Sequence, residues 1–158
     1  MSAEISFIGD QITFIFHALS RHPLWQDKLR AELVTLDLPS SFTDTLSPAT
    51  INNILSVSLL DATIKETLRL YPSVAASLHR VVPHGGRVID SYFIPGGATV
   101  GATAMMLHFD EAVSSVGGRY DVTAWLPERW LDDAADRGEM GRRLWAFGSG
   151  ERGCIGKQ

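Results

Sequence analysis

The single cysteine of the chain, Cys154, lies in the glycine-rich stretch AFGSGERGCIG. Three glycines of this stretch have the G-x-G-x-x-G spacing of a turn that binds the phosphates of a dinucleotide: Gly148, Gly150 and Gly153. Such a turn follows a strand and opens a helix. The residues before it, RRLWAF, do not have a good strand pattern, so phosphate binding is the less favoured use of this stretch.

A cysteine can instead act as a nucleophile or a metal ligand, provided that its thiol loses its proton. Arg152 lies two residues before Cys154 and would bring positive charge to the sulfur. Gly153 and Gly156 would let the backbone curl closely around it. None of the five histidines that could assist a catalytic cysteine stands in a recognisable nucleophile motif. The loop alone therefore leaves two roles open: a thiolate ligand, or a buried structural cysteine.

Helices are predicted for most of the first 72 residues. One face of the first segment carries aliphatic residues at helical spacing, namely Ile5, Ile8, Ile12, Ile15 and Leu19. Pro23 suits the first turn of a second helix. The apolar stripe of that helix consists of Trp25, Leu29, Leu33 and Leu36. DLPSSFTDTLSP reads as a loop, Ser47-Pro48 predicts a helix start, and helical sequence continues to Tyr71 with a break near residues 56–58.

The pattern changes to strands after Pro72. LHRVVPHGGRVIDSYFIPGGATVGA is rich in Val and Ile and interrupted by Gly-Gly and Pro-Gly, which predicts short strands joined by turns. TAMMLHFD predicts a short helix, and residues 111–144 are irregular, with Trp125, Pro127 and Trp130 as buried anchors. The order predicts a mainly α fold with a small β-sheet, an α+β class, and argues against a doubly wound sheet.

Length and composition exclude several classes of protein. The 158 residues suggest one domain, and a net charge of -4 argues against a nucleic acid partner. A lone cysteine cannot form an internal disulfide. We expect no signal peptide and no transmembrane segment, because no apolar run reaches the roughly 18 residues that a membrane span needs.

The cysteine loop resembles the haem-ligand loop of the cytochrome P-450 monooxygenases. Its residues match the pattern F-x-x-G-x-R-x-C-x-G at Phe147, Gly150, Arg152, Cys154 and Gly156. The resemblance implies that Cys154 is the axial thiolate ligand of haem iron and that Phe147, Arg152 and Gly156 lie beside the haem. A thiolate in this position favours O–O cleavage.

Other motifs of the family follow in the family's order. KETLRLYP, with Glu66 and Arg69, resembles its E-x-x-R helix, LPERW resembles its P-E-R-[FW] segment with Arg129, and RHPLWQDKLRAEL resembles the segment after its long central helix. The resemblance implies that Glu66, Arg69 and Arg129 form a buried structural triad. It also implies that Arg80, in SLHRVVP, pairs with a haem propionate, as guanidinium suits carboxylate.

The resemblance covers nearly the whole chain and implies a truncated C-terminal part of the cytochrome P-450 fold, from within the central helix to the cysteine-ligand loop. The expected parts are helices in residues 1–72, strands in 73–104, a short helix and meander in 105–145, and the ligand loop in 146–158. The segment VVPHGGRVIDSYFIPGG resembles fungal members, which implies a parent enzyme on the endoplasmic reticulum membrane. Its partners would be an NADPH-dependent reductase and a small apolar organic substrate.

The central helix departs from the family pattern. Counting back from His22, the acid and the alcohol that deliver protons in the family would fall near Phe7 and Ile8, and neither can carry a proton. We therefore expect the chain by itself to be inactive as a monooxygenase. The alternatives are a non-catalytic remnant and a haem-free interaction domain.

Overall fold

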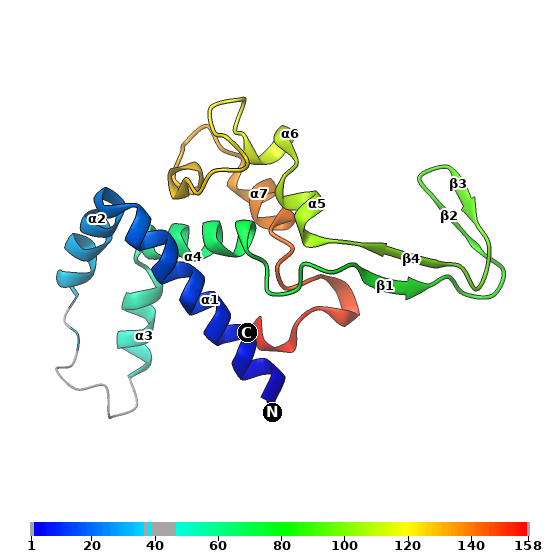
Figure 1. The fold of residues 1–158 in the computed structure, drawn as a ribbon, viewed down its shortest axis with the longest axis horizontal. Coiled ribbons are helices and arrows are strands. Elements are labelled where there is room, and N and C mark those ends of the chain that lie inside the picture. The colour runs from blue at the N-terminus through cyan, green and yellow to red at the C-terminus, as the bar shows by residue number, and fades with distance from the viewer. Residues whose placement is uncertain (1, 37, 39–46, 158) are drawn as a thin grey trace.

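Helices precede and follow two small pairs of strands in the computed structural model, which describes residues 2–36, 38 and 47–157 (Figure 1). The first helices are α1 (Ser2–Arg21), α2 (Pro23–Val34), α3 (Pro48–Leu55) and α4 (Ser58–Leu70). The strands are β1 (Leu78–Val81), β2 (Arg87–Ile89), β3 (Tyr92–Ile94) and β4 (Thr99–Ala102). The later elements are α5 (Ala104–His108), α6 (Glu111–Ser114), the 3-10 turn η1 (Pro127–Trp130), α7 (Arg137–Arg143), and the 3-10 turns η2 (Gly150–Arg152) and η3 (Ile155–Lys157). The predicted α+β class is confirmed.

Local signals set the starts of the helices. Pro23 is the first residue of α2, as predicted, where its missing N–H costs no hydrogen bond. Ser47 caps α3, and its hydroxyl accepts a hydrogen bond from the backbone nitrogen of Thr50 at 3.1 Å. The predicted break falls at Ser56 and Val57, between α3 and α4. Most of the loop predicted for residues 37–48 lies outside the described residues.

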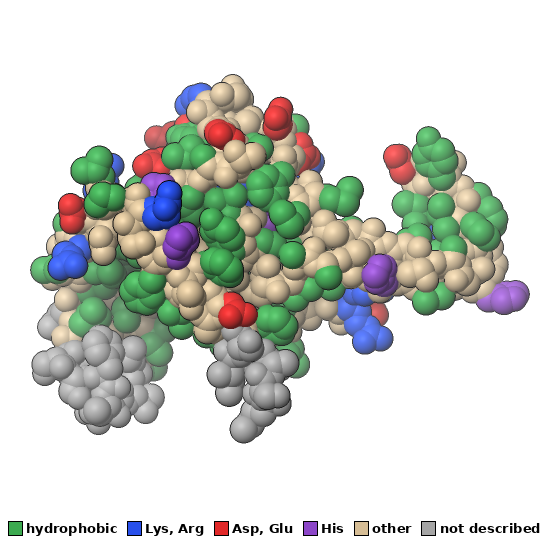
Figure 2. Space-filling model, in the orientation of Figure 1, with side chains coloured by type: hydrophobic (Ala, Val, Ile, Leu, Met, Phe, Trp, Pro, Cys, Tyr) green, Lys and Arg blue, Asp and Glu red, His purple; other side chains and the backbone are tan. Residues whose placement is uncertain are grey.

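The predicted small sheet is present as two antiparallel pairs. β1 pairs with β4, with Arg80 opposite Val100, and β2 pairs with β3 at the tip of the same projection. Glycines with positive φ lie between the two pairs, at Gly85, Gly86 and Gly97, and they interrupt the extended backbone. The result is a long arm with an exposed apolar tip that includes Val88, Tyr92 and Phe93, at one end of the molecule in Figure 2.

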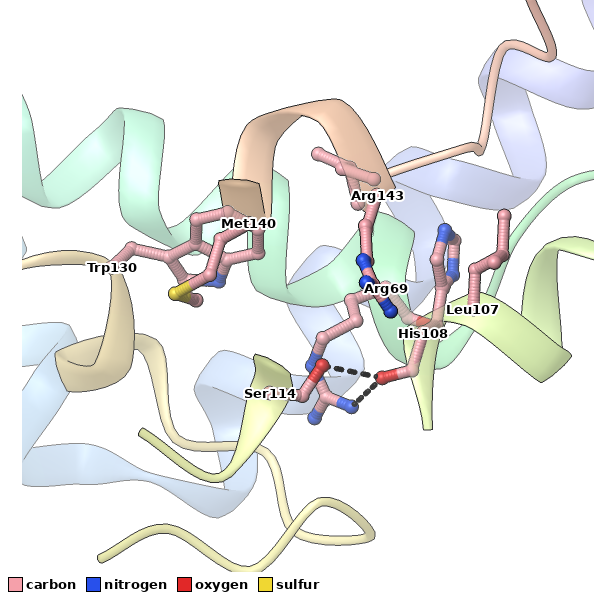
Figure 3. A pocket seen from close by; sticks show the side chains of 8 residues that line it. Arg69, Leu107, His108, Ser114, Trp130, Met140 and Arg143 are labelled. Carbon is pink, nitrogen blue, oxygen red and sulfur yellow. Dashed lines mark hydrogen bonds between the residues drawn. The ribbon is translucent and has the colours of Figure 1, made fainter. Parts of the chain in front are cut away.

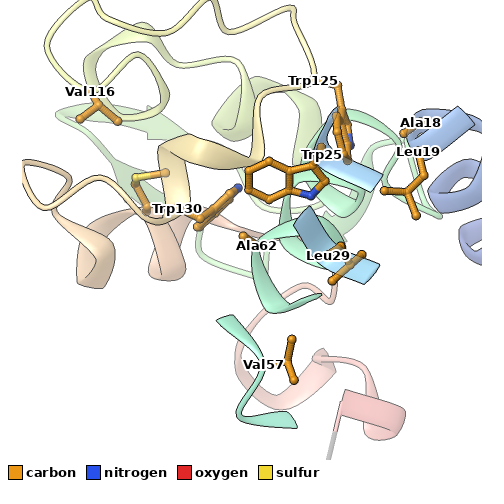
Figure 4. Close-up of a cluster of buried hydrophobic side chains, with 10 residues drawn as sticks. Ala18, Leu19, Trp25, Leu29, Val57, Ala62, Val116, Trp125 and Trp130 are labelled. Atoms are coloured by element: carbon orange, nitrogen blue, oxygen red, sulfur yellow. The ribbon is translucent and has the colours of Figure 1, made fainter. Parts of the chain in front are cut away.

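The hydrophobic core lies where α1 ends and where α2, α4 and the segment of η1 meet (Figure 4). Trp25 and Trp125 are buried and meet edge to face, with ring centroids 6.3 Å apart. The predicted stripe of α2 faces this core, with Trp25 and Leu29 buried and Leu33 packed against them. The predicted burial of Trp125, Pro127 and Trp130 is also confirmed.

Among the described side chains of the predicted apolar face of α1, Leu19 is buried and Ile15 packs against the core, while Ile8 and Ile12 are exposed, because α2 and α4 pack against the end of α1. The prediction of irregular structure for residues 111–144 needs correction. Within residues 111–144, α7 is a helix although its sequence, RGEMGRR, contains two glycines. Its start is fixed by Asp136, whose carboxylate accepts a hydrogen bond from the backbone nitrogen of Glu139.

Replacing Trp25 with alanine is expected to lower the free energy of unfolding by about 3–5 kcal/mol. The substitution removes a buried ring and leaves the hydroxyl of Thr63, which now accepts from Trp25 Nε1 at 2.8 Å, without that donor. Denaturant unfolding followed by circular dichroism measures the loss. Leu24→Ala, at an exposed position of the same helix, is the control and should stay within about 0.5 kcal/mol of the unsubstituted chain. Equal effects would contradict the assignment of Trp25 to the core.

Candidate functional site

The carboxylate of Glu66 is the centre of a buried ion cluster. Arg69 binds it with two hydrogen bonds of 2.9 Å, and Arg129 binds it through Nε at 3.0 Å. Trp130 Nε1 and the backbone nitrogen of Leu126 each donate at 2.9 Å. Glu66 and Arg129 have no exposed surface, and Arg69 is 2% exposed. The structure thus brings together the three residues of the E-x-x-R and P-E-R segments.

The two guanidinium groups of the cluster also hold the meander that follows α6. Arg69 donates to the carbonyl oxygens of Val122 at 2.7 Å and Ala124 at 3.1 Å. Arg129 donates to those of Asp121, at 2.8 Å, and Ser114. Burial lowers the pKa of Arg129, and the Glu66 carboxylate beside it opposes that shift. The cluster thus joins α4 to η1 and to the backbone between them through hydrogen bonds.

The cysteine loop is folded by its backbone. Gly148 and Gly150 have φ values of 65° and 66°, in the left-handed region that glycine adopts without strain. The backbone nitrogen of Cys154 donates to the carbonyl oxygen of Phe147 at 2.8 Å and closes the loop. Cys154 is exposed, which favours the role of a ligand over the alternative of a buried structural cysteine.

The groups around the sulfur of Cys154 are suited to hold a haem. A Cβ atom on Gly156 would lie 3.7 Å from Cys154 Sγ, so the glycine keeps one side of the sulfur open. Arg152 is exposed on the same loop. A cysteine sulfur, which is a soft donor, with an open side and an arginine two residues away that could bind a carboxylate fit an iron porphyrin. These residues therefore fit the haem that the sequence resemblance implies.

Phe147 begins the same loop, and Arg80 lies on β1, the strand that the loop approaches. A Cβ atom on Gly148 would lie 3.7 Å from the side chain of Leu78, so the loop passes close to β1. Leu78 and Arg80 are two residues apart on that strand and share a face. Arg80 is exposed and donates to the carbonyl oxygen of His79 at 2.7 Å, and Phe147 is half-buried.

Two positions of α1 depart from the family pattern. Phe7 and Ile8 lie on α1 and are exposed, at 42% and 65%. Thr13, a few residues further on, donates its hydroxyl to the carbonyl oxygen of Gly9 at 2.9 Å.

Basic residues beside the site are already paired. Arg142 and Arg143 both bind Glu139, and Arg143 also binds Asp110. These pairs favour an ordinary solvated surface at α7 over a basic docking patch.

Sequence reasoning singled out no role for one buried polar residue of the site. His108 is 2% exposed, and its ring binds the backbone of Arg69 and of Trp145, where the chain enters the cysteine loop. A signal was present in the sequence, since a histidine at the end of the apolar helix AMMLH would be buried and in need of partners.

Helices, small antiparallel strand pairs, a buried Glu66–Arg69–Arg129 cluster and an exposed cysteine loop are the features that the resemblance to the cytochrome P-450 family implies. The profile of the cytochrome P450 family matches residues 11–158, and the chain belongs to this family.

Fungal proteins are among its relatives. The chain is 41% identical over 149 residues to pisatin demethylase of Fusarium vanettenii, an alignment that covers 94% of the chain and 27% of the relative. It is 34% identical over 143 residues to a cytochrome P450 monooxygenase of Aspergillus flavus, covering 90% and 27%. It is 33% identical over 157 residues to a cytochrome P450 monooxygenase of Emericella nidulans, covering 99% and 31%. The chain thus spans about a quarter to a third of the length of these relatives.

A membrane-spanning helix is not found in the described part of the chain. None of the helices within residues 2–36 and 47–157 combines the length and the apolar character that crossing a bilayer requires.

Proposed function

We propose that the chain provides the thiolate ligand and part of the haem-binding surface of a monooxygenase of the cytochrome P450 type. The exposed thiol of Cys154, in a loop closed by its own backbone hydrogen bond, is the observation that carries this proposal. Membership of the cytochrome P450 family supports it. When bound, haem supplies the iron that activates molecular oxygen, and a thiolate ligand favours O–O cleavage.

Several residues of the chain would together hold the haem. Cys154 would bind the iron, and the bare backbone of Gly156 would leave room beside the sulfur. Arg152 and Arg80 would each bind a propionate, because a guanidinium offers paired donors to a carboxylate. Phe147 would pack against the haem beside the sulfur and keep water from one side of the Fe–S bond.

The ion cluster would act at a distance from the cofactor. Glu66 holds Arg69 and Arg129, which fix the meander by binding its carbonyl oxygens. A fixed meander and α4 provide a rigid support for the loop that carries Cys154. This role is structural, since these three side chains are buried away from the exposed sulfur.

The complete enzyme would insert one oxygen atom into a small apolar organic substrate. Electrons would come from NADPH through a reductase, and the enzyme would sit on the endoplasmic reticulum membrane. The names of the three fungal relatives, two of them monooxygenases and one a demethylase, support oxygen insertion as the reaction class.

A haem titration of the purified chain tests the proposal. We expect binding at one haem per chain, with fast exchange, since the loop is exposed from Ser149 to Lys157. No binding would favour the second candidate, a haem-free interaction domain, for which the exposed apolar tip of the β2–β3 arm is the supporting observation.

The chain by itself is expected to form no oxygenated product. A cofactor held on this exposed loop would be open to water, and Phe7 and Ile8 offer no group that carries a proton. The test is a reconstituted assay with haem, reductase, NADPH and a panel of apolar substrates. It is scored by product and not by NADPH consumption, with Cys154→Ser as the control. Product that requires both NADPH and Cys154 would contradict this prediction.

A further inference from the structure

His108, the last residue of α5, is enclosed by α4, α5 and α7. Figure 3 shows it beside Leu107 and Arg143, with Arg69 and Ser114 on the side of its carbonyl group. The cavity at this point has a volume of about 10 Å³. A space of that size holds at most about one water molecule. The polar atoms of the ring therefore depend on partners from the protein.

The hydrogen bonds of the ring fix its tautomer. Nδ1 lies 2.8 Å from the carbonyl oxygen of Arg69, and because a carbonyl only accepts, Nδ1 carries the proton. The backbone nitrogen of Trp145 lies 2.8 Å from Nε2 and donates to it, so Nε2 carries none. His108 is thus held as the neutral Nδ1–H form, with one nitrogen donating and the other accepting.

These two bonds join the end of α4 to the entrance of the cysteine loop. Arg69 lies in the last turn of α4, where carbonyl groups lack partners within the helix, and its side chain belongs to the ion cluster. Trp145 lies two residues after the end of α7 and two residues before Phe147, whose carbonyl oxygen accepts a hydrogen bond from the backbone nitrogen of Cys154.

The backbone of His108 is fixed as well. Its carbonyl oxygen accepts from Ser114 Oγ at 2.8 Å and from Arg69 Nη1 at 3.2 Å. His108 is therefore held through both its side chain and its main chain. Because its ring is bonded to Arg69 and to Trp145, the backbone of Trp145 is placed relative to the ion cluster.

We propose that His108 is a positioning residue for the Cys154 loop, because its neutral ring ties the backbone of Trp145 to the end of α4. The link itself is a property of the haem-free chain. Only its consequence, a better-placed iron ligand, rests on the proposed function.

Protonation of His108 would break this link. A proton on Nε2 would face the N–H group of Trp145, so that two donors would meet and the hydrogen bond would be lost. Burial lowers the pKa of His108 below its ordinary value of 6.5, the hydrogen bond to Arg69 opposes the shift, and the charge of Arg69 adds to it. The link is therefore intact at neutral pH, its contribution to stability declines below about pH 6.5, and it is lost as the pH falls through the lowered pKa of His108.

The charged side chains nearest the His108 ring each form an ion pair with a group of opposite charge. On α4, Arg69 faces His108 and is bound to Glu66. On α7, Arg143 lines the same cavity and is bound to Glu139 and to Asp110, which precedes α6. No carboxylate among the described residues binds the His108 ring, so nothing in that part of the chain compensates a charge on it.

Amide hydrogen exchange on the haem-free chain tests the proposal. The protection of the Trp145 amide, corrected for the intrinsic rate at each pH, should fall by about tenfold or more as the pH is lowered below 6.5. The Cys154 amide should follow it. The amide of Val82, which binds the carbonyl oxygen of Ala98 in the strand arm at 2.8 Å, should not change and controls for global unfolding.

Two substitutions distinguish the roles of the two ring nitrogens of His108. His108→Gln places an amide oxygen near the position of Nε2, so Trp145 should stay protected and its protection should no longer depend on pH. His108→Asn reaches only the position of Nδ1, so Trp145 should exchange about tenfold faster at every pH. His84→Gln, at an exposed position, should behave as the unsubstituted chain.

The exchange experiments test the role of His108 independently of the proposed function in haem binding. Trp145 protection that does not depend on pH in the unsubstituted chain would overturn the positioning role without any substitution. Equal exchange in His108→Gln and His108→Asn would do so as well. A haem titration of the same proteins reports on the proposed function, and its failure would leave the exchange result standing.

Discussion

Glu66→Ala is expected to lower the free energy of unfolding by about 3–5 kcal/mol, because it leaves two guanidinium groups buried without their carboxylate. Five hydrogen bonds of 2.9–3.0 Å end on that carboxylate, from Arg69, Leu126, Arg129 and Trp130. Arg129→Ala is expected to cost about as much. Denaturant unfolding of both variants, followed by circular dichroism, measures the two losses.

The double variant shows whether the cluster acts as one unit. Once Glu66 is absent, removing Arg129 relieves a buried charge, so the two losses should combine to far less than their sum. The salt bridge between Lys65 and Asp61 is the matched control, since it lies on the same helix but on its exposed side. Its two substitutions should couple by less than about 0.5 kcal/mol. Simple addition of the Glu66 and Arg129 effects would remove the case for a buried unit.

Cys154→Ser is expected to abolish thiolate ligation completely. Serine has nearly the same shape, but its hydroxyl stays protonated at neutral pH and is a poor ligand for haem iron. The exposed position of Cys154 means that the change should leave the fold intact. A haem titration followed by electron paramagnetic resonance of the ferric form measures the loss. Glu151→Gln, exposed on the same loop, is the control and should keep the signal. An unchanged ferric signal in Cys154→Ser would show that another group binds the iron.

Local patterns in the sequence predicted those features of the fold that neighbouring residues determine. The start of α2 at Pro23 and the cap of α3 at Ser47 follow from the geometry of single residues. The stripe that begins with Trp25 follows from helical spacing. The apolar face of α1 could not be predicted in the same way. Helical spacing identifies an apolar face but does not say which other element covers it. Ile8 and Ile12 are exposed although they belong to that apolar face.

The ion cluster needed more than local reasoning. The spacing of Glu66 and Arg69 predicts only that they share one side of a helix. Arg129 joins them from 63 residues away, and Trp130 and Leu126 complete the set of donors. The resemblance to the cytochrome P-450 motifs indicated the grouping, whereas no rule of spacing could have done so.

His108 shows a further limit. A histidine in an apolar helix predicts burial, but the choice between donor and acceptor at each nitrogen depends on which backbone groups face it. Those groups belong to Arg69 and Trp145, which lie far from His108 in the sequence. The role of the ring therefore became visible only in three dimensions.

The ferrous carbonyl spectrum of the haem-loaded chain tests the central claim most directly. Carbon monoxide bound opposite a thiolate gives a Soret band shifted to much longer wavelength than that of nitrogen-ligated haem. If Cys154 is the iron ligand, the unsubstituted chain will show the shifted band and Cys154→Ser will not. A chain whose carbonyl spectrum lacks that band, or a Cys154→Ser variant that keeps it, would contradict the assignment of Cys154 as the haem-thiolate ligand.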